Sequence, residues 1–193
     1  MARILASLRR APRRRPILDD RRGAVIVEFA LVAAPLITLI FAMIFASLAY
    51  LAQEALESAV EISARSIMTG QSQSSDIQGL SQGMTRAQLA ERFRKKGCEN
   101  LPGFMSCDRL YVEVKAASSG NGLLDSAVQL VIDASGKIGV PLSYDLGSQG
   151  AIVMVRFYYR WPMPIAPTAN LNSWGSGSAV LVATSVAKTE SYN

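Results

Sequence analysis

A single carboxylate stands inside the longest apolar stretch of the chain, and its position beside a glycine and two arginines is the first chemistry that the sequence offers. The segment reads RRGAVIVEFAL, with Gly23 directly before the apolar run and Glu28 five residues later. A carboxylate within lipid costs several kcal/mol unless it has a partner. Close to a helix start the helix dipole favours a negative charge, which explains why Glu28 is tolerated but not why a glycine precedes the run.

The element that must position Glu28 is a predicted membrane-spanning helix. Residues 24–52 contain no charged side chain except Glu28. About 20 apolar residues cross a bilayer, whereas the apolar part of a cleaved secretory signal has only about 7–15. The length therefore favours an anchor over a secretory signal that is removed.

The charges that flank the predicted span set its expected orientation. Arg21 and Arg22 precede the span, and acidic residues follow it at Glu54, Glu57 and Glu61. Positive charge is favoured on the cytoplasmic side. We therefore expect residues 1–23 in the cytoplasm of a bacterium and residues 53–193 in the periplasm.

The basic character of the chain belongs to its first 23 residues. These carry eight arginines against two aspartates, although the whole chain has a net charge of only +5. A basic arm that binds nucleic acid is one alternative. Because the arginines adjoin a membrane span, we expect the partner to be inner-membrane lipid and expect no nucleic acid.

Helical periodicity continues beyond the span. Residues 24–69 are predicted to form one long helix whose second half is amphipathic, with apolar positions at Ala52, Ala55, Leu56, Ala59, Val60 and Ile67. Residues 70–84 are polar and contain glycines, which predicts a loop. Residues 85–96 are predicted to form a short second helix that Thr85 caps.

After Cys107 the apolar period changes from helical to the alternation of strands. Four segments predict strands: 110–116, 127–133, 151–161 and 178–187. We expect an α+β fold in which the amphipathic half of the long helix packs on an antiparallel sheet of about four strands. The predicted organisation is a leader (1–23), an extended N-terminal helix (24–69) and a periplasmic α+β domain (70–193).

The two cysteines are predicted to form a disulfide in an oxidising compartment. Cys98 and Cys107 bracket ENLPGFMS, whose proline and glycine suit a chain reversal. A loop this short would stabilise the fold by about 2–3 kcal/mol. Two free buried thiols are the alternative.

Enzymatic chemistry is not expected from this composition. The chain has no histidine, its outer carboxylates are scattered, and SSGNG at 118–122 lacks the lysine that follows a phosphate-binding loop. We expect no catalytic residues, no metal site and no cofactor. A periplasmic enzyme held by the anchor remains the enzymatic alternative.

The motif around Gly23 resembles the processing signature of type IV pilins, in which a basic leader ends in glycine and a glutamate stands fifth in the mature chain. More narrowly, RRGAVIVEFALVAAPLI resembles the TadE-type pseudopilins of the tight adherence (Tad, Flp pilus) machinery, and Phe29 after Glu28 fits that pattern. AYLAQEALESAVEISARSIMTG and ATSVAKTESY resemble later parts of the same family. The resemblance implies cleavage between Gly23 and Ala24 by a prepilin peptidase.

The resemblance also implies a pilin-like fold and a minor-pilin function. The protein would be a single-pass inner-membrane subunit that acts in pilus assembly, adhesion and secretion, and that enters an extracellular pilus or lies beneath one. Its partners would be the prepilin peptidase, other pilins or pseudopilins, and the Tad inner-membrane platform. The alternative is a periplasmic binding domain that stays anchored and is never cut.

Overall fold

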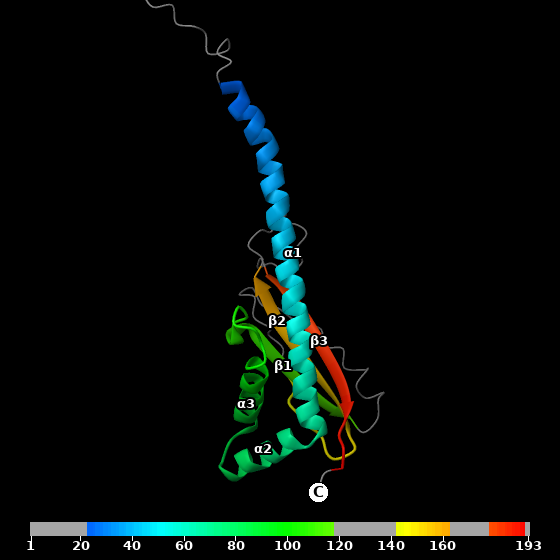
Figure 1. The fold of residues 1–193 in the computed structure, drawn as a ribbon. Coiled ribbons are helices and arrows are strands. Elements are labelled where there is room, and N and C mark those ends of the chain that lie inside the picture. Colours follow the sequence, from blue (N-terminus) through cyan, green and yellow to red (C-terminus); the bar gives the residue numbers. More distant parts are fainter. Residues whose placement is uncertain (1–22, 118–141, 163–177, 192–193) are drawn as a thin grey trace, which may run out of the picture. The chain divides into compact units, whose positions relative to one another are not determined.

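A computed structural model of the chain describes residues 23–117, 142–162 and 178–191. By its internal contacts the chain divides into two compact units, Met1–Ala46 and Ser47–Asn193. The described elements (Figure 1) are, in chain order, α1 (Ala24–Met68), α2 (Gln71–Ser81), α3 (Arg86–Cys98), the short 3-10 helix η3 (Cys107–Arg109), β1 (Leu110–Ala117), β2 (Ile152–Pro162) and β3 (Ser178–Lys188). The fold is α+β.

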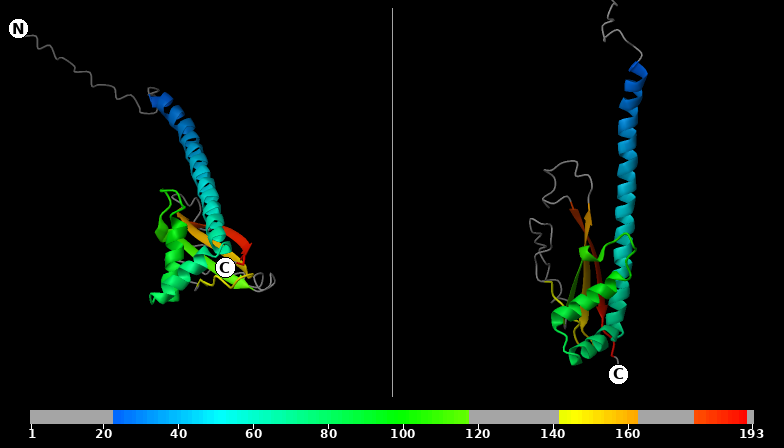
Figure 2. Two further views of the ribbon diagram at one scale, coloured as in Figure 1. Left: turned by 60° about the horizontal axis from the view of Figure 1, so that its bottom comes forward. Right: turned by 90° about the vertical axis from the view of Figure 1, so that its left-hand side faces the viewer.

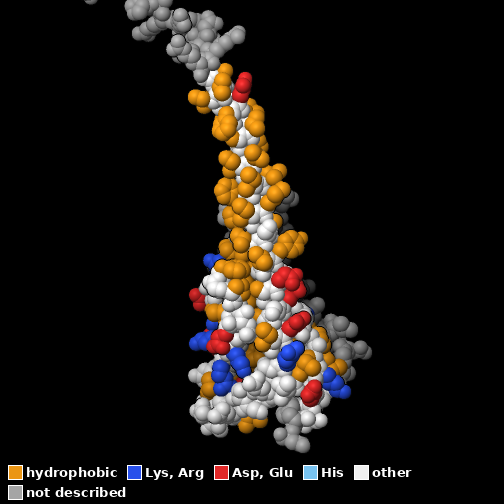
Figure 3. All heavy atoms as spheres, viewed as in Figure 1, with side chains coloured by type: hydrophobic (Ala, Val, Ile, Leu, Met, Phe, Trp, Pro, Cys, Tyr) orange, Lys and Arg blue, Asp and Glu red, His pale blue; other side chains and the backbone are white. Residues whose placement is uncertain are grey.

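In the unit Met1–Ala46, the described structure is the first half of α1. The helix continues through Pro35, as prolines in apolar helices can. It is the one described helix long and apolar enough to cross a membrane, and none of its most apolar window is buried. Figure 3 shows apolar side chains along the visible face of this part of α1. Such a helix needs lipid or other helices around it.

In the unit Ser47–Asn193, the second half of α1 is amphipathic. Its buried residues are Ala52, Leu56, Ala59, Val60, Ser63, Ala64 and Ile67. They form one apolar cluster with sheet residues that include Leu110, Val114, Val155 and Phe157. Figure 2 shows this half of α1 running along one face of the sheet. The predicted packing of an amphipathic helix half on a sheet is confirmed.

The prediction of a loop over 70–84 is wrong, because Gln71–Ser81 forms α2. Gly70 ends α1 with a φ of 76°, a left-handed conformation that glycine adopts without strain, so a new helix starts at once. Few apolar side chains hold α2, which is why its sequence shows no helical period. Its buried residues are Ser72, Gln73 and Gly79.

Helix α3, which the sequence predicts as the second helix, begins at its predicted cap residue, Thr85. The Thr85 side chain accepts a hydrogen bond from the Gln88 backbone N–H, and the Gln88 side chain accepts one from the Thr85 N–H, which is a complete capping box. Leu89 and Phe93 are buried on one face of α3. The helix extends to Cys98, two residues beyond its predicted end.

The described sheet has three antiparallel strands in the order β1-β2-β3, not about four. Glu113 pairs with Arg156 across β1 and β2, and Arg156 pairs with Thr184 across β2 and β3. The fourth predicted strand, 127–133, lies outside the described residues. A single parallel bridge joins Val114 to Tyr144.

Candidate functional site

Gly23 lies at the entrance of α1 and is exposed. No described atom lies within 4 Å of the place where a Cβ would be. The peptide bond that joins Gly23 to Ala24 therefore stands at the first residue of the helix, with no described side chain packed on the glycine. A peptidase could reach this bond without unfolding a packed core.

Glu28 is the fifth residue of α1, and the first turn of the helix contains no acidic residue. Because the dipole effect falls off within the first turn, the dipole is a weak explanation for this carboxylate. Its neighbours are apolar and exposed, with Val25 73% and Phe29 73% accessible. No described residue forms an ion pair with Glu28. Glu28 is thus an acidic group in an apolar environment whose partner is not among the described residues.

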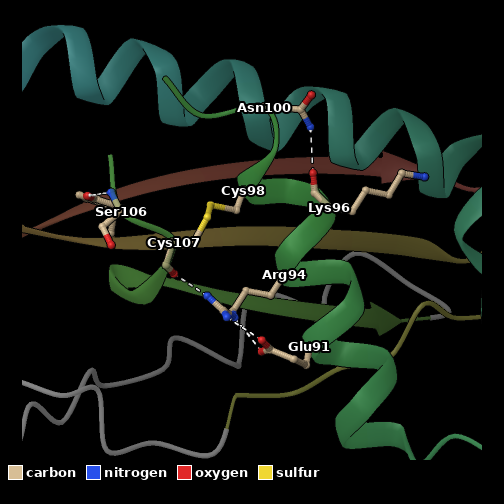
Figure 4. Close-up of a disulfide and its surroundings, with 8 residues drawn as sticks. Glu91, Arg94, Lys96, Cys98, Asn100, Ser106 and Cys107 are labelled. Carbon is tan, nitrogen blue, oxygen red and sulfur yellow. Dashed lines mark hydrogen bonds and ion pairs between the residues drawn. A yellow bond between two sulfur atoms is a disulfide. The ribbon is translucent and has the colours of Figure 1, made fainter. Parts of the chain in front are cut away.

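The disulfide lies in the other unit and joins the end of α3 to the start of the sheet. Cys98 and Cys107 are bonded, with their Cα atoms 5.7 Å apart. Arg94 donates to both carboxylate oxygens of Glu91, at 2.6 and 2.7 Å, and to the backbone carbonyl of Cys107 (Figure 4). The hydrogen bond from Arg94 holds the pKa of the Glu91 carboxyl below its usual value. Arg94 therefore fixes the same junction as the disulfide.

A buried carboxylate connects strands on the sheet face opposite α1. Glu113 is 1% exposed and accepts a hydrogen bond of 3.0 Å from the Tyr158 hydroxyl. Its other oxygen lies 3.0 Å from the ammonium of Lys115, and Arg156 stands 3.8 Å away. Burial raises the pKa of Tyr158, so its phenol stays neutral as a donor. The Glu113 carboxylate thus has its partners within the sheet, and the contacts with Tyr158 and Arg156 connect β1 to β2.

A second polar cluster holds α2 against α3 and the segment before β2. Asp76 accepts from the Tyr144 hydroxyl at 2.9 Å and pairs with Arg92 at 3.0 Å. Burial raises the pKa of Tyr144, and Asp76 raises it further. Gln73 donates to the carbonyl of Leu146, while its own amide oxygen has no partner in the part of the chain that is described.

Neither cluster has the composition of a catalytic or metal centre. Within residues 23–117, 142–162 and 178–191, no three His, Cys, Asp or Glu side chains gather as metal ligands. The exposed Gly23–Glu28 segment is the feature that the rest of the fold leaves unexplained.

A protein-family model described as TadE-like protein matches residues 23–65. The N-terminal helix is therefore similar to that of TadE-like proteins. No curated protein and no solved structure gives a significant match to the chain.

The TadE-like match begins at Gly23 and ends at Arg65. It includes Glu28 and both halves of α1, but none of α2, α3 or the sheet. The match covers less than half of the chain, and what it shows is that α1 is similar to the helix of TadE-like proteins, a family of pilin-like structural proteins associated with the Tad pilus. The helix is apolar enough to anchor such a protein in a membrane.

Several residues beyond the TadE-like match were missed by sequence reasoning. The burial of Gln73 was missed because Gln71–Ser81 carries no apolar period. The alternation of residues 110–116 places Glu113 on the sheet face opposite Val112 and Val114, but it does not reveal that Glu113 is almost completely buried. The sequence feature that could have indicated this burial is Arg156, two positions before Tyr158. The strand register brings Arg156 opposite Glu113.

Proposed function

We propose that the chain is a minor pilin-like subunit of a Tad pilus, cut between Gly23 and Ala24 by a prepilin peptidase. The observation that carries the proposal is the position of Glu28. It is a carboxylate without a described partner, in an exposed apolar helix, five residues after an exposed glycine.

Cleavage would supply the charge that Glu28 lacks. A new α-amino group at Ala24 has a pKa of about 8 and is largely protonated at neutral pH. In an assembly the apolar halves of α1 from neighbouring copies would pack together, and Glu28 of one copy would lie beside the amine of Ala24 in the next. A buried ion pair sets register, because breaking it leaves an uncompensated charge.

The membrane arrangement follows from the same charges. Residues 1–23 would lie in the cytoplasm, the first half of α1 in the inner membrane, and the unit Ser47–Asn193 in the periplasm. The Tad inner-membrane platform and other pilins or pseudopilins would be its partners. The outer unit would contact them while the helix assembles, and adhesion would follow from its place in the pilus.

The experiment is expression of the full chain in a bacterium with a Tad apparatus, with size and assembly measured separately. Gly23→Ser should leave the leader attached, because the processing signature that this segment resembles has glycine at the cut. Gly103→Ser is the matched control, since no described atom lies near that glycine either. Normal cutting of the Gly23→Ser chain would contradict the cut site.

Glu28→Ala separates cutting from assembly. The variant should be cut normally and should remain in the membrane fraction instead of the sheared pilus fraction. Incorporation of the Glu28→Ala chain into pili at the wild-type level would contradict the proposed pairing of Glu28 with the amine of Ala24. A chain that is stable, membrane-bound and never cut would instead be an anchored periplasmic domain.

A further inference from the structure

A groove within the unit Ser47–Asn193 separates the second half of α1 from α3. Its volume is about 280 Å³. The floor is formed by Ser63, Phe93 and Gly97, while Ile62, Arg65 and Lys96 stand at its edge. We call it the cationic groove. Figure 4 shows the Lys96 side chain extending from α3 on the side of α1, away from the disulfide.

The two cations of this groove differ from two arginines of α3, Arg92 and Arg94. Arg92 is paired with Asp76, and Arg94 with Glu91. Arg65 and Lys96 have no ion pair with any described residue. Two like charges at the edge of a hollow attract an anionic partner more strongly than the same charges on a flat surface.

The chain carries the complementary surface on the outward face of α1. Glu54, Glu57 and Glu61 are exposed and recur at three- and four-residue spacing, which places them on one stripe of the helix. We call them the acidic stripe. None forms an ion pair with a described cation, and Glu61 leaves Arg65, one turn away, unpaired.

We propose that Glu61 of a second copy of this chain binds between Arg65 and Lys96, with the two copies offset by four residues along α1. Four helical residues correspond to about 6 Å. The same number of residues separates Glu28 from Ala24 in the sequence. The inference rests on the proposed function for its partner and names a second contact, outside the membrane.

The offset selects Glu61 among the three acidic residues. With copies displaced by four residues, Glu61 lies level with Arg65 of the neighbour. Glu54 lies seven residues before Glu61, so it is about 10 Å along the helix axis from the level of the neighbour's Arg65. Two Glu61 residues from neighbouring copies are separated axially by about 6 Å.

The test is cross-linking between two differently tagged full-length copies in cells with the Tad apparatus. Each copy carries one added cysteine, and a short bis-maleimide joins the free thiols, since Cys98 and Cys107 are bonded to each other. The cysteines stand at Ser58 and Ile62, two exposed residues that are also four positions apart, so that Glu61, Arg65 and Lys96 stay intact. The dimer yield should be highest for Ser58→Cys with Ile62→Cys. It should be lower for Ser58→Cys with itself, and lowest for Leu51→Cys with Ile62→Cys. Equal or reversed yields overturn the offset.

A charge reversal tests the groove itself. Lys96→Glu should lower the 58–62 dimer yield about fivefold, because Glu61 of the second copy then loses a charge contact, and a surface charge contact is worth at most about 1 kcal/mol. Lys95→Glu is the matched control, since Lys95 is exposed and does not line the groove. Equal effects of the two reversals contradict the cationic groove.

Chain size, read from the same samples, separates this inference from the proposed function. Cut chains that give no preferred 58–62 dimer overturn the groove contact and leave the processing proposal standing. Uncut chains that still give the dimer overturn processing and keep the contact. Uncut chains without the dimer overturn both, and a 58–62 product of any mass other than the dimer overturns the choice of a second copy.

Discussion

Gly97→Ala would add a methyl group where α3 lies close to Phe157 of the sheet. A Cβ at Gly97 would lie 2.7 Å from Cζ and 3.0 Å from Cε2 of Phe157. Phe157 is fully buried in the core, so its ring cannot swing into solvent. Alanine within an exposed helix usually gains up to about 1 kcal/mol over glycine, whereas overpacking a core costs about 1–3 kcal/mol. We expect a net loss of about 1–2 kcal/mol.

The assay is thermal unfolding of the full chain in a mild detergent, followed by near-ultraviolet circular dichroism of the core aromatics. For a chain of this size the loss corresponds to a midpoint lower by roughly 2–8 °C. Gly103→Ala is the control, because no described atom lies within 4 Å of its Cβ position, and its midpoint should not change measurably. A Gly97→Ala midpoint equal to or above the wild type would refute the packing of α3 against Phe157.

Three further changes test the outer unit by the same unfolding assay. Leu56→Ala should cost about 2–5 kcal/mol, since Leu56 is fully buried, whereas Ile62→Ala on the half-exposed side of α1 should cost far less; equal losses would contradict the helix orientation. Cys98→Ser should lower stability by about 2–3 kcal/mol, and the loss should vanish when both proteins are measured under reducing conditions. Burial raises the pKa of Tyr144 and Tyr158, so their contribution to the free energy of unfolding is full below about pH 10 and is lost as the pH rises through the pKa of the folded state. A free energy of unfolding that does not change up to strongly alkaline pH would contradict their burial.

The long helix and the sheet could be predicted because their apolar residues repeat with a clear period. The α1 prediction was one residue longer than the helix, and the β1, β2 and β3 predictions were each one residue off at one or both ends. The apolar face of the second half of α1, with Leu56 and Val60 at its centre, packs on the sheet as the spacing required.

The polar elements could not be predicted in the same way. Helix α2 is held by Ser72, Gln73 and a glycine turn, and such residues are equally frequent in loops. The polar contacts of Glu113 depend on the strand register, because the register determines which residue of β2 lies opposite a given residue of β1. The cationic groove depends on how closely α3 approaches α1, which no local pattern contains.

The identity of the first residue of the protein recovered from the membrane tests the account most directly. N-terminal sequencing of the full chain, produced beside its Tad apparatus, should begin at Ala24 and read AVIVEF. Protein that still begins within residues 1–23 would show that no amine is made beside Glu28. The carboxylate would then have no charge partner in the membrane, and the pilin-like assembly proposed here would be wrong.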